Sequence, residues 1–320
     1  EMYKIIFIVV LFQIRCFTTS RIFNDDFISK INRNQSLWTA GKVFHDNSTL
    51  KNLFSVFPER KLKLAALHGG TNEKQTLPQD FVASSKWRKC KSLEEVPNQG
   101  NCAGAWAIAV TSVYRDRMCI KNNTKTHASE KYLMSCCGDC GQGCFGGYLD
   151  VALGYFQNHG LPSGGKKGCQ PYSVDPLPSH EGAILCHKVR ETTGWCFEKR
   201  CSNEKSMRSN SLVKIQGAFK VQGEARIRAE IFNNGPVMGV MIVFEDLLVY
   251  RGGVYRHTEG ALVGKQQVRI VGWGIDKKTR AKYWLVVNSW GSLWGESGRV
   301  RILRGVNECD LEDNIVTMKV

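Results

Sequence analysis

The stretch Gln99-Gly-Asn-Cys-Ala-Gly-Ala-Trp106 decides the fold of this chain. The turn-forming segment 95–98 leads into it, and apolar residues at helical spacing follow it, which predicts an amphipathic helix that begins near Ala103. A thiol at such a helix start would lie at the positive end of the macrodipole and would be a reactive thiolate. The chain has Ala105 there, so the stretch has the layout of a nucleophile loop without its nucleophile. The apolar stripe of the helix consists of Ala105, Trp106, Ala109, Val110, Val113 and Tyr114.

Composition places the chain among ordinary globular proteins. It has 320 residues, of which 42% are hydrophobic and 23% are charged, and this length suggests about two domains. The formal net charge is +15. The cationic residues are spread along the chain and form no basic block interleaved with aromatic residues, so the sequence does not predict nucleic-acid binding. A basic surface instead favours acidic partners or anionic membranes.

The first 20 residues are predicted to be a secretory signal peptide. Lys4 precedes an apolar run from Ile5 to Phe12, which is too short to cross a bilayer. We expect cleavage between Cys16 and Ser20. Since no later segment is apolar enough for a membrane span, the sequence predicts a soluble protein that is secreted, extracellular or carried to lysosomes or endosomes. Sequons for N-glycosylation fit this route and occur at Asn34, Asn47 and Asn122.

Cysteine usage agrees with export. The chain has 13 Cys residues, and in an exported protein such a number predicts disulfides. A zinc knot is the alternative for one cluster, and the export signal makes disulfides the better interpretation. No metal or other cofactor is predicted. The members of this cluster are Cys136, Cys137, Cys140 and Cys144.

The chain divides into three parts after the signal. Residues 21–76 form a first unit with a short amphipathic helix within Phe23–Leu37. Residues 77–205 are mostly helical and rich in Cys. Residues 206–320 are rich in strands, so the expected fold class is α+β. Further helices are predicted at Ser129–Leu133, capped by Ser129, at Tyr148–His159, ended by Gly160, and at Glu224–Phe232. Strands are predicted at Gln267–Gly274, Tyr283–Trp290, Arg299–Leu303 and Ile315–Val320.

The pattern Gln99-Gly-x-Cys102-x-x-x-Trp106 resembles the active-site block of papain-like cysteine proteases, whose signature is Cys-Gly-Ser/Ala-Cys-Trp/Tyr. The likeness spans nearly the whole chain and is nearest to the cathepsin B type. It implies a papain-like fold with two halves, a helical left domain of about residues 77–205 and an antiparallel β-barrel-like right domain of about residues 206–320, with a cleft between them. Further blocks in the family's order are Asn234-Gly-Pro-Val237, Tyr250–Tyr255, Val268–Gly274, Asn288-Ser-Trp-Gly291 and Ile302–Gly305.

The resemblance also assigns the first unit. Trp38-Thr-Ala-Gly41 is similar to a turn in the cathepsin B propeptide, and Leu77-Pro78 resembles the start of the mature enzyme. Residues 21–76 are therefore expected to be a propeptide that lies in the cleft and blocks it. The polar, Gly-rich segment 69–74 is a plausible place for cleavage.

Thiol proteolysis needs a thiolate, an imidazole, a group that orients the imidazole, and donors for the oxyanion. The resemblance places Ala105 at the nucleophile position. The family's Gly-His-Ala-Val/Ile-Arg-Ile stands here as Gly264-Lys-Gln-Gln-Val-Arg-Ile270, so Gln266 takes the His position. An amide does not titrate near neutral pH and cannot act as general acid or base. The orienting Asn288 and the oxyanion donor Gln99 remain, as does Trp290, which shields the Asn in the family.

The groove is expected to be partly retained. Gly146 and Gly147 match the family's Gly-Gly that pairs with substrate backbone, although a simple turn is the alternative. Asn314 stands where cathepsin B has a carboxylate that accepts basic side chains, so that preference should be lost. In the region of the occluding loop, His180 stands alone where the family has two His, and Cys186 has lost its partner. The family's pocket positions fall on Tyr148, Leu149, Val240, Gln267 and Asn314.

The disulfides come from the resemblance, position by position. Cys186 and Cys309 are left over. The implied pairs are Cys90–Cys119, Cys102–Cys144, Cys136–Cys196, Cys137–Cys140 and Cys169–Cys201.

These residues favour a secreted, catalytically inactive homologue of cathepsin B. Expected partners are a peptide or protein ligand in the groove, cystatin-like inhibitors and the chain's own propeptide. Two alternatives stay open, an active cathepsin B-like cysteine endopeptidase and a storage or structural protein without a ligand.

Overall fold

The computed structural model describes residues 24–43, 54, 63–66, 75–173, 201 and 211–320. Several features predicted from the sequence lie outside these residues: the signal peptide, Asn47, most of the expected processing segment, and His180, Cys186 and Cys196 of the region 174–200. Within the described residues, no helix has both the length and the apolar character needed to cross a membrane.

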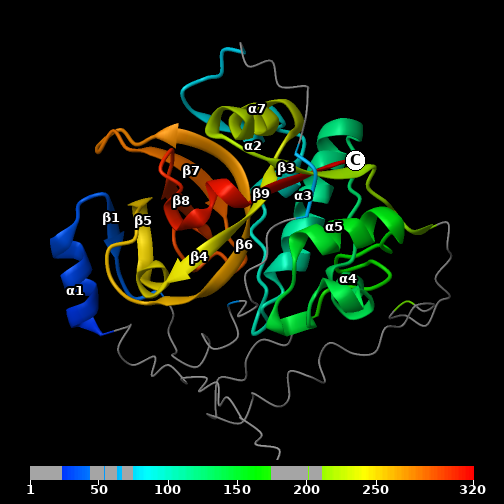
Figure 1. Ribbon diagram of the computed structural model, residues 1–320, viewed down its shortest axis with the longest axis horizontal. Coiled ribbons are helices and arrows are strands. Elements are labelled where there is room, and N and C mark those ends of the chain that lie inside the picture. Colours follow the sequence, from blue (N-terminus) through cyan, green and yellow to red (C-terminus); the bar gives the residue numbers. More distant parts are fainter. Residues whose placement is uncertain (1–23, 44–53, 55–62, 67–74, 174–200, 202–210) are drawn as a thin grey trace, which may run out of the picture.

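The described chain forms two halves side by side (Figure 1). One half holds α3 (Ala105–Asn122), α4 (Glu130–Cys136) and α5 (Leu149–Asn158). The other is built around a sheet with the strand order β1-β5-β8-β7-β6-β4-β9-β3, to which β2 adds by pairing with β6. The predicted α+β class and papain-like fold are confirmed. The strands are β1 (Trp38–Ala40), β2 (Phe81–Val82), β3 (Gly217–Val221), β4 (Val237–Phe244), β5 (Tyr250–Tyr255), β6 (Leu262–Ile275), β7 (Lys282–Val287), β8 (Arg299–Leu303) and β9 (Ile315–Lys319).

The N-cap residues set where two of the helices begin. The helix α3 begins at Ala105, two residues later than expected, because Gly104 is its N-cap and the N–H of Ala103 donates to the Cys144 carbonyl at 2.9 Å. Ser129 caps α4, and its hydroxyl accepts from the Tyr132 N–H. The described part also holds the helices α2 (Ala83–Lys86) and α7 (Glu224–Asn234) (Figure 1).

The strand β6 is the centre of the sheet half. It pairs antiparallel with β4 on one side and with β7 on the other. In this register Gln266 lies opposite Met241 and Gln267 lies opposite Val240. The strand begins at Leu262, five residues before the predicted start, because Lys265 and Gly264 also pair with β4. The pair β5–β8 is parallel, whereas the other pairs of named strands are antiparallel.

The first unit packs against the sheet half. The helix α1 (Asp25–Asn34) is capped by Asn24, and the following β1 pairs antiparallel with β5. Figure 1 shows α1 and β1 together on the outer side of that half. The Lys30 ammonium lies 2.9 Å from the Glu259 carboxylate, so an ion pair joins the unit to the β5–β6 connection.

Disulfides hold the helical half. The bond Cys102–Cys144 ties the loop before α3 to the Gly-rich segment before α5. Cys136 is also disulfide-bonded. The bonds in the described part agree with the pairing that the resemblance implies: Cys90–Cys119, Cys102–Cys144, Cys137–Cys140 and Cys169–Cys201.

Two buried ion pairs join α3 to the sheet half. Asp116 pairs with Arg269 of β6, and Arg117 pairs with Glu230 of α7 at 2.8 Å. The Asp116 side chain is fully buried, and Arg269 also donates to the main-chain carbonyl of Glu95. Breaking one partner of such a pair leaves an uncompensated buried charge.

We expect Asp116→Ala to lower the free energy of unfolding by about 3–5 kcal/mol, because the Arg269 guanidinium would stay buried without its carboxylate. Asp139, an exposed residue of the same half, supplies the matched control, and Asp139→Ala should change stability by less than about 0.5 kcal/mol. Unfolding in guanidinium chloride, followed by fluorescence, measures the free energy of unfolding of both variants. Equal stability of the two variants would contradict the role of this ion pair.

Candidate active site

The first residue of α3 is the nucleophile position that the sequence assigns. Ala105 is 1% exposed, and its methyl group offers neither a lone pair nor an acidic proton. The cavity beside it, between α3 and the segment 287–289, measures about 10 Å³. That is about the size of one water-sized probe, so this point of the molecule is closely packed.

Gln266 binds the other retained site residues through its side-chain amide. Its Nε2 donates to Asn288 Oδ1 and to Gln99 Oε1, both at 2.9 Å, and lies 3.1 Å from Ser289 Oγ. Gln266 is 1% exposed and Asn288 is equally buried. The structure therefore brings Gln99, Gln266 and Asn288 together in one buried hydrogen-bond network, next to the start of α3. The amide supplies donors to this network but no titrating group.

Gln99 is held by its own loop as well as by Gln266. Its Nε2 donates to the Cys102 carbonyl at 2.8 Å, and its Oε1 accepts from the Ser289 hydroxyl at 2.6 Å. The Tyr172 hydroxyl donates to the main-chain carbonyl of Gln99 at 2.8 Å. At least one amide hydrogen of Gln99 is thus committed inside the loop rather than to an oxyanion.

The groove positions Gly146 and Gly147 belong to the segment that packs on α3. Gly146 has φ +118°, a value that favours glycine. A Cβ on Gly147 would lie 2.7 Å from both the Cys140 carbonyl oxygen and the Trp106 ring. Packing therefore requires glycine here whether or not a ligand binds. The Gly147 carbonyl accepts a hydrogen bond from Gln267 Nε2 at 3.3 Å.

The remaining groove positions expected from the sequence lie on several elements. Tyr148 is the N-cap of α5 and Leu149 is its buried first residue. Val240 is half-buried on β4, and Asn314 Nδ2 donates to the Asp310 carbonyl at 2.9 Å. Trp290 is 5% exposed and stacks edge-on against Phe54 of the first unit, with ring centroids 5.5 Å apart.

Cys309 and His257 make contacts outside the Gln99–Gln266–Asn288 network. Cys309 is buried and unpaired, and burial, followed by the nearby Glu308 and Asp246 carboxylates, raises the pKa of its thiol well above the usual range. His257 Nδ1 lies 3.2 Å from both oxygens of Asp246 and its ring stacks on Phe244. A reactive thiolate needs a lowered pKa, so Cys309 is not a candidate nucleophile.

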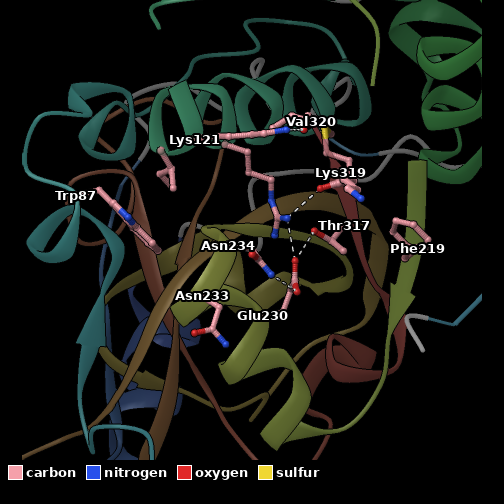
Figure 2. A pocket seen from close by; sticks show the side chains of 12 residues that line it. Trp87, Lys121, Phe219, Glu230, Asn233, Asn234, Thr317, Lys319 and Val320 are labelled. Carbon is pink, nitrogen blue, oxygen red and sulfur yellow. Dashed lines mark hydrogen bonds and ion pairs between the residues drawn. The ribbon is translucent and has the colours of Figure 1, made fainter. Parts of the chain in front are cut away.

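A larger hollow of about 730 Å³ lies at the other end of α3 (Figure 2). Arg117 and Glu230 are among its lining residues, and Arg117 also donates to the carbonyls of Gly235, Pro236 and Met318. Glu230 also accepts from Asn234 Nδ2 at 2.8 Å. These two charged groups of the lining are therefore bound to the protein itself. Arg117 is about 18 Å along the helix from Ala105, at 1.5 Å per residue.

In the described part of the chain, no three His, Cys, Asp or Glu side chains gather in a way that would hold a metal ion. The Cys cluster that could have been a zinc knot is disulfide-bonded at all four positions.

Comparisons with known proteins give the family. Residues 81–319 match the papain family of cysteine proteases. A cathepsin B-like cysteine proteinase 5 of Caenorhabditis elegans is 36% identical over 309 residues, which cover 90% of this chain and 88% of that protein. A cathepsin B-like cysteine proteinase of Schistosoma japonicum is 33% identical over 310 residues, 92% of this chain and 90% of that protein.

A solved structure agrees with these relatives. The procathepsin B S9 of Trypanosoma congolense superposes with a TM-score of 0.80 at 29% identity, covering 93% of this chain and 98% of that one. The chain therefore belongs to the papain family of cysteine proteases, among its cathepsin B-like members.

Some residues of the site were not found from the sequence. Ser289 links Gln99 to Gln266, and Tyr172 holds the Gln99 carbonyl. Ser289 lies inside the Asn288-Ser-Trp-Gly291 block, so its position next to Asn288 was a usable signal. Nothing in the sequence marks Tyr172, because its contact depends on how the segment after Cys169 folds back.

Gln266→Met keeps the length of the side chain and removes its amide, so Gln99 Oε1 and Asn288 Oδ1 lose a donor. We expect this variant to lose about 1–3 kcal/mol of stability, because it removes the buried hydrogen bonds of the Gln266 amide to Gln99, Asn288 and Ser289, which contribute roughly 0.5–1.5 kcal/mol each. Gln157 is exposed on α5, and Gln157→Met should change stability by less than about 0.5 kcal/mol. Calorimetric melting temperatures test this, and a Gln266→Met protein as stable as the parent would contradict it.

Proposed function

We propose that this chain is a catalytically inactive, cathepsin B-like pseudoprotease that is exported and acts by binding. The observation that carries the proposal is the pair Ala105 and Gln266. Ala105 stands at the start of α3, where the family has its nucleophile, and the Gln266 amide donates to Asn288 where the family's imidazole would be oriented.

Loss of both groups removes each chemical step of thiol proteolysis. Ala105 cannot attack a carbonyl, and the Gln266 amide cannot protonate a leaving amine. Oxyanion stabilisation and binding alone can leave roughly 10³–10⁴-fold acceleration over water. Against the slow hydrolysis of an amide, that remainder amounts to no useful activity.

The retained scaffold supports a binding role. The loop 99–106 keeps its disulfide to Cys144, and the Gln99–Gln266–Asn288 network keeps the two walls of the site packed. Candidate ligands are a peptide, a cystatin-like inhibitor or another protein. Export, disulfides and the sequons at Asn34 and Asn122, which are exposed at the ends of α1 and α3, fit a role outside the cell or in lysosomes.

The first unit supports a chain that keeps its propeptide. The main-chain N–H of Lys63 donates to Asp150 of α5 at 3.0 Å, and the Lys220 N–H of β3 donates to the Ala65 carbonyl at 2.9 Å. Phe54 packs on Trp290. These contacts, together with the β1–β5 pairing, hold the unit across both halves. Without a nucleophile, the chain cannot remove this unit itself.

The two alternatives differ in what they would bind and cleave. An active endopeptidase would need a nucleophile and base other than those of its relatives. A storage or structural protein would bind neither peptide nor inhibitor. The amide network at the site favours the pseudoprotease over the active enzyme.

The expected result of a fluorogenic peptide assay on processed protein is no turnover above a Gln99→Ala, Asn288→Ala control. Turnover above that control would contradict the proposal. The double reversion Ala105→Cys with Gln266→His should restore thiol-dependent cleavage, because it returns the thiolate and the imidazole next to Asn288. Blocking by a thiol-alkylating reagent confirms the source of that activity.

Edman sequencing of the protein purified from its natural source tests the state of the propeptide. We expect an N-terminus between Cys16 and Ser20, as in an unprocessed proform. A start between Leu67 and Leu77 would instead show that another protease matures the chain and frees the groove.

A further inference from the structure

Gln267 reaches from one half of the molecule to the other. It lies on β6 in the sheet half, and its Nε2 donates to the carbonyl of Gly147, which precedes α5 in the helical half. The assignment of the amide is fixed by its partner, since only the NH₂ end of a Gln can face a carbonyl oxygen. The Gln267 side chain therefore links the sheet half to the helical half through this hydrogen bond, which we call the tie.

The partner of this tie is the group that the resemblance gives to ligands. Gly147 is part of the Gly-Gly pair that binds substrate backbone in the family, and the family has Ala at the position of Gln267 in the block Gly-His-Ala-Val/Ile-Arg-Ile. An Ala side chain cannot reach across the groove or donate a hydrogen bond. Here the chain's own amide takes the acceptor that a peptide N–H would take.

The Gln267 side chain is buried in the space beside the Gly147 carbonyl. Gln267 is 5% exposed, and its Oε1 is buried without a hydrogen-bond partner. Stability alone does not explain this residue, because a buried acceptor without a donor weakens the fold. The next inward residue of the same strand face is Arg269, which also reaches into the helical half to pair with Asp116. The strand β6 therefore directs alternate side chains to that half, as its period of two requires.

We propose that Gln267 closes the groove to extended peptides by occupying the Gly147 carbonyl and the space beside it. This inference rests on the proposed function, because it concerns the same groove, and it sharpens the ligand. A partner of this chain then binds the groove without the backbone pairing at Gly147, or binds another surface. Two adjacent residues of β6 thus act separately: Gln266 replaces the catalytic base, and Gln267 blocks the binding of peptide backbone.

The test compares specificity in the reverted enzyme. In the full-length chain carrying Ala105→Cys and Gln266→His, matured with an added protease, we expect a high KM for blocked dipeptide coumarin amides. Adding Gln267→Ala should lower KM at least about tenfold and change kcat less than about threefold, because the freed carbonyl binds ground state and transition state alike. An unchanged KM would overturn the inference.

Gln157 supplies the matched control. It is exposed on α5 and is none of the groove positions. In the same background Gln157→Ala should change KM less than about twofold. A fall in KM equal to that of Gln267→Ala would mean that the effect does not come from the Gly147 contact, and would overturn the inference.

A binding measurement tests the same inference without requiring cleavage, in case the reverted protein is inactive. On the Ala105 chain with its linker cut, saturation-transfer NMR with acetyl-Phe-Ala-amide gives a dissociation constant for the parent and for Gln267→Ala. We expect the variant to bind at least about fivefold tighter, and equal binding would overturn the inference. Neither result bears on whether the parent cleaves peptides, so this proposal and the proposed function can fail independently.

Discussion

The ion pairs of Asp116 and Arg117 hold the two halves of this protein together. These neighbouring residues of α3 point to different partners, Arg269 on β6 and Glu230 on α7. All four side chains are almost fully buried, so the attraction acts in a medium of low dielectric and the charges cannot return to water without unfolding. Because Arg269 lies only three residues after Gln266, the same contact that docks α3 on the sheet also sets Ala105 close to the Gln266 network.

On the proposed function, the site keeps the shape of a catalytic centre without its chemistry. In the family, an imidazole donates a hydrogen bond to the Asn at the position of Asn288. When the imidazole is absent, another group must supply that donor. The Gln266 amide supplies that donor and also reaches Gln99 and Ser289. A fully apolar replacement would have left the oxygens of Gln99 and Asn288 short of a donor in a buried place. Hydrogen-bond satisfaction therefore explains why an amide, rather than an aliphatic side chain, suits this position.

Much of this arrangement could be predicted from the sequence, for reasons that differ from residue to residue. The helix α3 follows from its apolar spacing, the cap of α4 from Ser129, and the family from motifs in a fixed order. The start of α3 was predicted two residues too early, because the Ala103–Cys144 contact comes from a segment about 40 residues later in the chain. The tie between Gln267 and Gly147 and the contact of Tyr172 with Gln99 could not be predicted, since both join segments whose approach depends on the whole tertiary fold.

On the proposed function, the positions of Gln266 and Gln267 explain how two adjacent residues of one strand can affect catalysis and binding separately. Side chains of adjacent strand residues point to opposite faces, so one serves the hydrogen-bond network beside Asn288 while the other reaches the Gly147 wall. An active protease must keep both faces open, one for the imidazole and one for the peptide, and it gives up stability to do so. If cleavage is lost, as proposed above, a side chain that packs either face is tolerated. The packed face beside Gly147 then lowers the activity that a restored nucleophile and base recover, because the substrate binds weakly there.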